Sequence, residues 1–208
     1  VGLSEEDLGE RMIQGFTFAK QLGVGLTGSV YKAWRKVDVG GRRSSRRVNM
    51  MAKMEDEKDG KFAAVAVKVM DKAKILEINE TAHVVQESKI MKSVSKHPFI
   101  ISMLESFQIP SAMFIVMEYA AGRDMFFMIH ERGTLTLFQT RAYITQVTLA
   151  LDHVHSKGFI YRDLKPENLL IRDDGYLRLT DFGFAKALKP GERAYTVCGT
   201  PDYPAPAT

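Results

Sequence analysis

The residues best suited to chemistry lie together in one short segment that contains an acid, a lysine and an amide. The segment reads Tyr161-Arg162-Asp163-Leu164-Lys165-Pro166-Glu167-Asn168. Asp163 can orient a hydroxyl group for in-line attack and accept its proton. Lys165 can neutralise the charge of a phosphoryl group, and Asn168 can hold a magnesium ion. This combination predicts the transfer of a phosphoryl group to a hydroxyl.

A second metal-binding candidate follows after a predicted hairpin. Asp181 opens the triplet Asp181-Phe182-Gly183, thirteen residues after Asn168. Its carboxylate is a hard oxygen ligand of the kind that Mg²⁺ prefers. The triplet alone is common by chance, but its position just beyond a hairpin favours a function. Asn168 and Asp181 are therefore the predicted Mg²⁺ ligands.

A glycine cluster earlier in the chain could bind phosphates. It reads Gly23-Val24-Gly25-Leu26-Thr27-Gly28, and glycines let the backbone approach a phosphate closely and present its N–H groups. The pattern is weak alone, since an ordinary glycine-rich hairpin or a Rossmann dinucleotide site also fits it. A Rossmann motif opens a helix, whereas Val30 to Trp34 predicts a strand. A charged insertion also occupies the place, about 20 residues on, of the ribose-binding acid.

Lys68 and Glu87 are the candidates for an ion pair. Lys68 lies near the end of an apolar strand predicted over Ala63–Met70, where a lone lysine is more often an exposed edge residue. Glu87 lies on the apolar face of a helix predicted over 77–95, and a carboxylate buried there needs a partner. We expect Glu87 to hold Lys68 toward nucleotide phosphates. The alternative for Glu87 is a boundary residue at the helix edge.

Hydrophobic periodicity and turn signals predict the elements that must position these residues. The predicted order is a strand–turn–strand over 16–34, a polar insertion over 36–61, a strand over 63–70, a helix over 77–95, a strand over 113–117, a helix over 138–157, and strands over 169–171 and 176–180. Ser4 additionally looks like a helix cap. The helix 138–157 places Ile144, Val147, Leu151 and Val154 on one face, with Gly158 at its end. We expect an α+β fold.

Composition excludes several classes of protein. The 208 residues are 45% hydrophobic and 26% charged, which is ordinary for a soluble globular protein. No signal peptide and no run of about 20 apolar residues is present, so we expect no membrane partner. Because Cys198 is the single cysteine, the chain has no internal disulfide, and we expect a cytoplasmic location. The basic run near Arg42 is followed by acids and lacks aromatics, which argues against nucleic-acid binding.

These motifs occur in the order found in protein kinases, and the chain resembles the AGC group of Ser/Thr kinases. The resemblance is strongest to the cAMP-dependent kinases, because Tyr161 opens the catalytic loop and the segments Asp181–Lys186 and Thr196–Pro201 follow. It covers nearly the whole chain outside 36–61. It implies a bilobal kinase-like fold, with a partial catalytic domain over 1–208 that is cut off after the activation segment. The implied parts are an N-lobe over 1–117, a hinge over 118–122 and a partial C-lobe over 123–208.

The resemblance implies ATP and Mg²⁺ as cofactors and assigns a role to each candidate residue. The implied phosphate contacts are Gly23, Gly25, Gly28 and Lys68; the implied adenine contacts are Val30, Ala66, Met117, Glu118, Ala120 and Leu170. The implied catalytic residues are Asp163, Lys165, Lys68 and Glu87, and the implied metal ligands are Asn168 and Asp181. A stacked regulatory spine would consist of Met91, Met103, Tyr161 and Phe182.

Regulation and substrate choice are also implied. Thr196 corresponds to the activation-loop phosphosite, with Arg162, Lys186 and His83 as cations around it. Asp124 and Glu167 correspond to positions that bind an arginine before the target Ser/Thr, so protein or peptide substrates with basic residues are the expected partners. A regulatory subunit is a further partner that the resemblance allows. The insertion carries Arg42-Arg43-Ser44-Ser45, which suggests autophosphorylation at Ser45.

Three departures from the family pattern leave an alternative open. The 36–61 insertion is longer than the usual connection, Pro204 replaces an apolar residue, and Ala207 stands where the family has a glutamate. The chain also ends at Thr208, before the arginine that normally pairs with that glutamate. The expected function is that of a Ser/Thr protein kinase, and the alternative is a non-catalytic ATP-binding fragment or scaffold.

Overall fold

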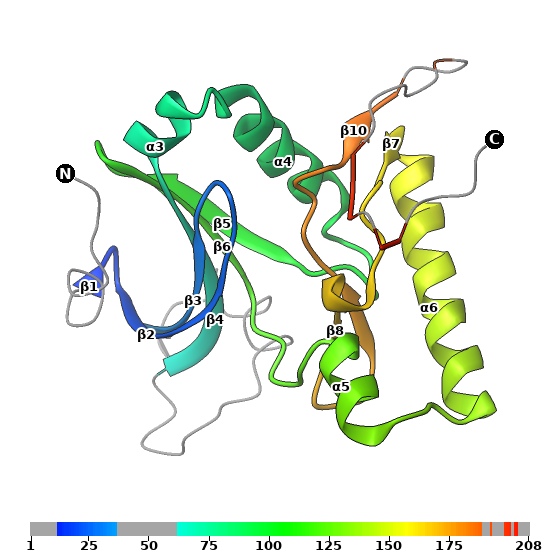
Figure 1. The fold of residues 1–208 in the computed structure, drawn as a ribbon. Coiled ribbons are helices and arrows are strands. Elements are labelled where there is room, and N and C mark those ends of the chain that lie inside the picture. The colour runs from blue at the N-terminus through cyan, green and yellow to red at the C-terminus, as the bar shows by residue number, and fades with distance from the viewer. Residues whose placement is uncertain (1–11, 37–61, 189–191, 193–197, 201, 204–208) are drawn as a thin grey trace. The chain divides into compact units, whose positions relative to one another are not determined.

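A computed structural model describes residues 12–36, 62–188, 192, 198–200 and 202–203. The predictions for Ser4, Ser45, Thr196, Pro204 and Ala207 lie outside the described residues, as does nearly all of the polar insertion. The chain forms two compact units, one of residues 1–81 with 103–119 and the other of residues 82–102 with 120–208. Both units contain helices and strands (Figure 1), which confirms the α+β class. Within the described residues, every helix is too short or too polar to cross a bilayer.

The first unit is built on a six-stranded antiparallel sheet with the strand order β1-β2-β3-β4-β6-β5. Its strands are β1 (Met12–Ile13), β2 (Phe16–Val24), β3 (Ser29–Lys36), β4 (Phe62–Asp71), β5 (Met103–Gln108) and β6 (Ala112–Glu118). Every strand predicted in this part of the sequence is present. A strand, not a helix, follows Gly28, and this excludes the Rossmann alternative.

The two faces of this sheet differ because side chains alternate along each strand. One face forms a hydrophobic core of Phe16, Phe18, Tyr31, Ala33, Val65, Val67, Val69, Ala112, Phe114 and Val116. On the other face Val30 is directly opposite Lys68, and Ala66 is opposite Met117. Four predicted nucleotide contacts therefore share the face that is not occupied by this core.

The single helix predicted over 77–95 is wrong at its beginning. A short helix, α3 (Lys72–Glu77), directly follows β4, and the carboxylate of Asp71 caps it by accepting a hydrogen bond from the Ala73 N–H at 2.7 Å. Asn79 then takes a φ of 57°, in the left-handed region, which interrupts the helical path. The longer helix, α4, begins only at Thr81 and runs to Val94.

The second unit combines helices with two small two-stranded sheets, the β8–β9 hairpin and the pair β7–β10 (Figure 1). Besides α4 it contains α5 (Met125–Arg132), α6 (Leu137–Ser156), β7 (Phe159–Ile160), the 3₁₀ helix η1 (Pro166–Asn168), β8 (Leu169–Ile171), β9 (Leu177–Leu179) and β10 (Lys186–Ala187). In α4 the buried residues are Val84, Glu87, Ile90, Met91 and Val94. This confirms that the Glu87 carboxylate shares the apolar face.

Helix α6 confirms the predicted element and part of its predicted face, since Val154 is buried and Val147 and Leu151 are half-buried. Thr136 caps the helix, since its hydroxyl accepts from the Gln139 N–H at 3.2 Å while the Gln139 side chain accepts from the Thr136 N–H at 3.0 Å. The buried residues are Gln146, Ala150 and Val154, whereas Ile144 is 61% exposed. The prediction grouped apolar residues and passed over Gln146, whose carbonyl oxygen accepts from the Leu177 N–H of β9 at 2.8 Å.

Main-chain hydrogen bonds attach the β8–β9 hairpin to the segment that follows α4. The Leu179 N–H donates to the Phe99 carbonyl oxygen at 2.8 Å, and the Ile101 N–H donates to the Leu179 carbonyl oxygen at 2.9 Å. Together with the bond from Leu177 to Gln146, they fix the strand that leads directly to Asp181.

Candidate active site

The segment 161–168 connects β7 to β8 and is anchored by its first residue. Tyr161 is buried, its hydroxyl donates a hydrogen bond to the Thr180 carbonyl oxygen, and its ring meets that of Phe182 edge-on at 5.3 Å. Burial raises the pKa of Tyr161 well above its usual value, with Asp181 and Asp163 adding to the effect. The phenol therefore stays protonated as a donor, and it ties the loop to the residues just before Asp181.

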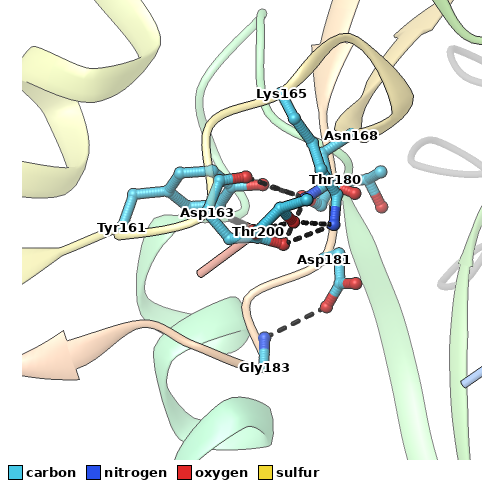
Figure 2. Close-up of polar contacts among 8 residues, drawn as sticks. All are labelled: Tyr161, Asp163, Lys165, Asn168, Thr180, Asp181, Gly183 and Thr200. Carbon is cyan, nitrogen blue, oxygen red and sulfur yellow. Dashed lines mark hydrogen bonds and ion pairs between the residues drawn. The ribbon is translucent and has the colours of Figure 1, made fainter. Parts of the chain in front are cut away.

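Asp163 is the centre of the polar network in Figure 2, and only 3% of it is exposed. Its Oδ2 atom accepts from Lys165 Nζ and from Asn168 Nδ2, both at 2.9 Å. Its Oδ1 atom accepts from the Thr200 hydroxyl at 2.8 Å. Burial by itself raises the pKa of Asp163, but the hydrogen bonds from Lys165, Thr200 and Asn168 outweigh burial and lower it. The carboxylate is therefore ionised and held in one orientation.

Thr200 was not among the candidate site residues, although its hydroxyl also accepts from Lys165 Nζ at 2.7 Å. It reaches the loop because Gly199 precedes it, with a φ of 101°. A Cβ atom at Gly199 would lie 2.7 Å from the Arg162 carbonyl oxygen, so no other residue fits without a shift. The signal in the sequence was a glycine directly before a hydroxyl residue, which permits such a close approach.

Asn168 and Asp181 have the right chemistry for Mg²⁺. The Asn168 amide nitrogen donates to the carbonyl oxygen and the side chain of Asp163, so the amide oxygen is the atom that could serve as a ligand. The Asp181 carboxylate is exposed and accepts from the Gly183 N–H at 3.1 Å. Mg²⁺ commonly takes one or two carboxylates plus water and phosphate oxygens. The described residues contain no cluster of three acids, histidines or cysteines that could enclose a metal.

A backbone hydrogen bond joins the segments that carry these two candidate ligands. The Thr180 N–H donates to the Asn168 carbonyl oxygen at 3.0 Å, so Asp181 directly follows a residue bonded to the loop. Asp181 has a φ of 58°, a conformation unusual for a residue other than glycine. Strain of this kind collects at functional sites, where the surrounding structure maintains it.

The glycine cluster forms the turn between β2 and β3 and contains two kinds of glycine. The Gly25 N–H donates to the Gly28 carbonyl oxygen at 2.8 Å, which closes the turn. A Cβ atom at Gly28 would lie 2.2 Å from the Val69 carbonyl oxygen, so the packing of the turn against β4 requires glycine there. At Gly23 a Cβ atom would meet nothing within 4 Å, and the protein's own packing does not require glycine at this position.

The remaining candidates are distributed over both units. Val30, Ala66, Lys68, Met117 and Glu118 belong to the first unit; Glu87, Ala120 and Leu170 belong to the second. The ion pair between Lys68 and Glu87 stays a prediction. Asp124 caps α5 by accepting from the Phe127 N–H at 2.8 Å, and Glu167 is exposed on η1. Capping of α5 explains why an acid is present at position 124. The role of Asp124 in substrate binding stays a prediction.

Comparison with known proteins agrees with this geometry. A model described as "Protein kinase domain" matches residues 48–208. The rat "Serine/threonine-protein kinase Sgk2" is 35% identical over 92% of this chain and 46% of its own length. A Caenorhabditis elegans "cAMP-dependent protein kinase, catalytic subunit-like" protein is 38% identical over 69% of this chain and 35% of its own length. The Dictyostelium discoideum "cAMP-dependent protein kinase catalytic subunit" is 36% identical over 74% of this chain and 23% of its own length.

The matches cover most of this chain but less than half of each relative. The chain spans less than half the length of each of the three relatives. The family model begins after the glycine turn, whereas the alignment with the rat kinase covers nearly the whole chain. The region matched by the family model, residues 48–208, contains every residue of the Asp163 network and also Asp181. The chain therefore belongs to the protein kinase domain family, with relatives of the AGC type.

Proposed function

We propose that this chain carries the ATP-binding and catalytic residues of a Ser/Thr protein kinase, which transfers the γ-phosphoryl group of ATP to a protein hydroxyl. The observation that carries the proposal is the buried, ionised Asp163, held by three donors on a loop tied to Asp181. The names of the AGC-type relatives support the same reaction. The proposed organisation is a catalytic domain over 1–208 with an N-lobe over 1–117, a hinge over 118–122 and a partial C-lobe over 123–208.

Asp163 is proposed to act mainly by positioning the acceptor hydroxyl. Among the described residues Oδ1 receives one hydrogen bond, from Thr200, and a carboxylate oxygen can accept two. The second lone pair can therefore accept the substrate hydroxyl. A carboxylate of lowered pKa is a weak base. A weak base is sufficient if the transition state is loose, because the acceptor hydroxyl then keeps most of its proton until late in the transfer. Lys165, paired with Asp163, is proposed to stabilise charge on the transferred phosphoryl group.

The nucleotide is proposed to bind through the turn after β2 and the sheet face that carries Lys68. Gly23 and Gly25 present N–H groups to the phosphates, and the open space at Gly23 supports contact with an external ligand. Val30 and Ala66 on one face, with Leu170 of β8, are the proposed adenine contacts. Glu118 and Ala120 are the proposed hydrogen-bonding backbone positions, next to Met117. Glu87 is the proposed partner of Lys68.

Mg²⁺ is proposed to be held by Asn168 and Asp181 through oxygen atoms. When bound, the ion would neutralise phosphate charge and stabilise the transition state. The role of the chain is to present those oxygens in fixed orientations. For Asn168 the two hydrogen bonds to Asp163 provide this orientation, and for Asp181 the Gly183 N–H does.

Substrate recognition and regulation are proposed mainly from the family resemblance. Glu167 and Asp124 would recognise basic residues before the target Ser/Thr. Phosphorylated Thr196 would meet Arg162, whose Nη1 is buried without a hydrogen-bond partner among the described residues, while its Nε donates to the Phe184 carbonyl oxygen at 2.8 Å. A buried guanidinium nitrogen with unused donors favours an anionic partner. A cytoplasmic location and a regulatory subunit belong to the same proposal.

The test is a phosphotransfer assay on the full 208-residue chain, with γ-labelled ATP, Mg²⁺ and a peptide that carries arginines before a serine. We expect label on the peptide with the wild type and none with Asp163→Asn, which keeps the size of the side chain but not its charge. ATP binding is measured separately by calorimetry. Nucleotide binding without transfer by the wild type would instead support the alternative of a non-catalytic ATP-binding fragment.

A further inference from the structure

Lys32 on β3 lies between two aromatic rings on the sheet face that carries Ala66 and Lys68. Its ammonium group is 4.7 Å from the centroid of the Trp34 ring and 4.7 Å from the centroid of the Tyr119 ring. Both distances lie within the range of a cation–π interaction. All three side chains are half-buried, which limits the screening of the charge by water. We name Lys32, Trp34 and Tyr119 the aromatic clamp.

The strand register explains how the clamp can form. β4 lies between β3 and β6, so a side chain of β3 reaches Tyr119, just after β6, only by crossing β4. The residue of β4 directly opposite Lys32 is Ala66, and the residue opposite Trp34 is Ala64. These alanines are 9% and 7% exposed, and their small side chains leave room for the lysine to pass over β4. A larger side chain at either position would block this path.

We propose that Lys32 is a positioning residue for the nucleotide, because it holds Tyr119 in place between the two backbone positions that bind adenine. The inference rests on the proposed function, in which Glu118 and Ala120 supply those backbone groups. A clamp of two rings on one cation restrains the chain just where β6 ends at Glu118. Preorganisation of a binding segment increases affinity because less ordering is needed when the ligand binds. The clamp therefore acts on ATP affinity and not on the transfer step.

The clamp also offers a direct optical probe. Trp34 is the only tryptophan of the chain, so its fluorescence reports on this site alone. Lys32→Met keeps an unbranched side chain but removes the charge, and it should alter the Trp34 emission. Lys36→Met removes the same charge from an exposed lysine on the same face of the same strand, and the emission should not change.

The test compares Lys32→Met, Lys32→Arg and Lys36→Met in the full chain, with ATP binding, steady-state kinetics and thermal unfolding. We expect Lys32→Met to raise the dissociation constant and the KM for ATP on the order of fivefold, the effect of losing about one cation–π contact. The kcat and the KM for the peptide should stay unchanged. Lys32→Arg should restore ATP affinity, because a guanidinium also binds aromatic rings.

Two results would overturn the inference. Wild-type ATP affinity in a folded Lys32→Met variant would show that the clamp does not position the nucleotide. A loss spread equally over kcat, peptide KM and thermal stability would make Lys32 a purely structural residue. An absence of ATP binding by the wild-type chain is a separate outcome, and it would remove the proposed function together with this inference.

Discussion

Replacing Thr200 by valine removes one hydroxyl from the Asp163 network and preserves its approximate volume. The hydroxyl donates to Asp163 Oδ1 at 2.8 Å and accepts from Lys165 Nζ at 2.7 Å. A hydrogen bond to a charged group contributes about 1.5–3 kcal/mol, and each 1.36 kcal/mol is tenfold in rate. If this contribution is used to position Asp163, we expect kcat/KM to fall about 10- to 150-fold.

The same substitution should change the pH dependence in a defined direction. Burial favours the protonated form of Asp163, and the three hydrogen bonds together overcome burial. Losing the bond from Thr200 must therefore raise the pKa of Asp163, so activity in the variant is lost at a higher pH during acidification. The assay is peptide phosphorylation from acid to neutral pH, with Thr200→Ser as the control that keeps the hydroxyl. Identical rates and pH profiles for the valine and serine variants would refute the reasoning.

Three further predictions test other parts of the molecule. Gly28→Ala should lower the thermal unfolding temperature, whereas Gly23→Ala should leave it unchanged and raise the KM for ATP; equal effects on stability would contradict the packing argument. The pKa of His97 is lowered from 6.5, first by burial and then by His153. Denaturant titrations should therefore show the free energy of unfolding falling as the pH drops below 6.5, and this fall should be absent in the His97→Gln variant. Asp181→Asn should raise the Mg²⁺ concentration needed for half-maximal activity, because a neutral amide binds the ion more weakly; an unchanged requirement would exclude it as a ligand.

Local sequence patterns predicted the strands of the first unit and the burial of Glu87. They succeed there because alternation and helical periodicity are properties of a few neighbouring residues. The same method failed at the start of α4, where Asn79 adopts a left-handed conformation that periodicity does not encode. It also missed the burial of Gln146 in α6, because the hydrogen bond that satisfies this side chain comes from a strand 31 residues away in the chain.

The Asp163 network was predictable only where its residues are close in sequence. Asp163, Lys165 and Asn168 lie within one segment, and their motif carries the family resemblance. Thr200 joins them from 35 residues beyond Lys165, and a contact at that separation depends on the folded chain. The aromatic clamp is similar, since it requires the register of three strands and two alanines at the right places.

The edge of β9 that does not pair with β8 affects whether the protein can aggregate through strand pairing. A two-stranded hairpin such as β8–β9 is marginal alone, and an open strand edge is a template for pairing with another chain. Here the Leu177 N–H is taken by the Gln146 side chain, and both backbone groups of Leu179 are taken by Phe99 and Ile101. This edge is therefore closed to intermolecular pairing once the unit has folded. The amides of Leu177 and Leu179 should consequently exchange with deuterium slowly, and a chain that exchanges them quickly would be one in which this edge is open and prone to aggregate.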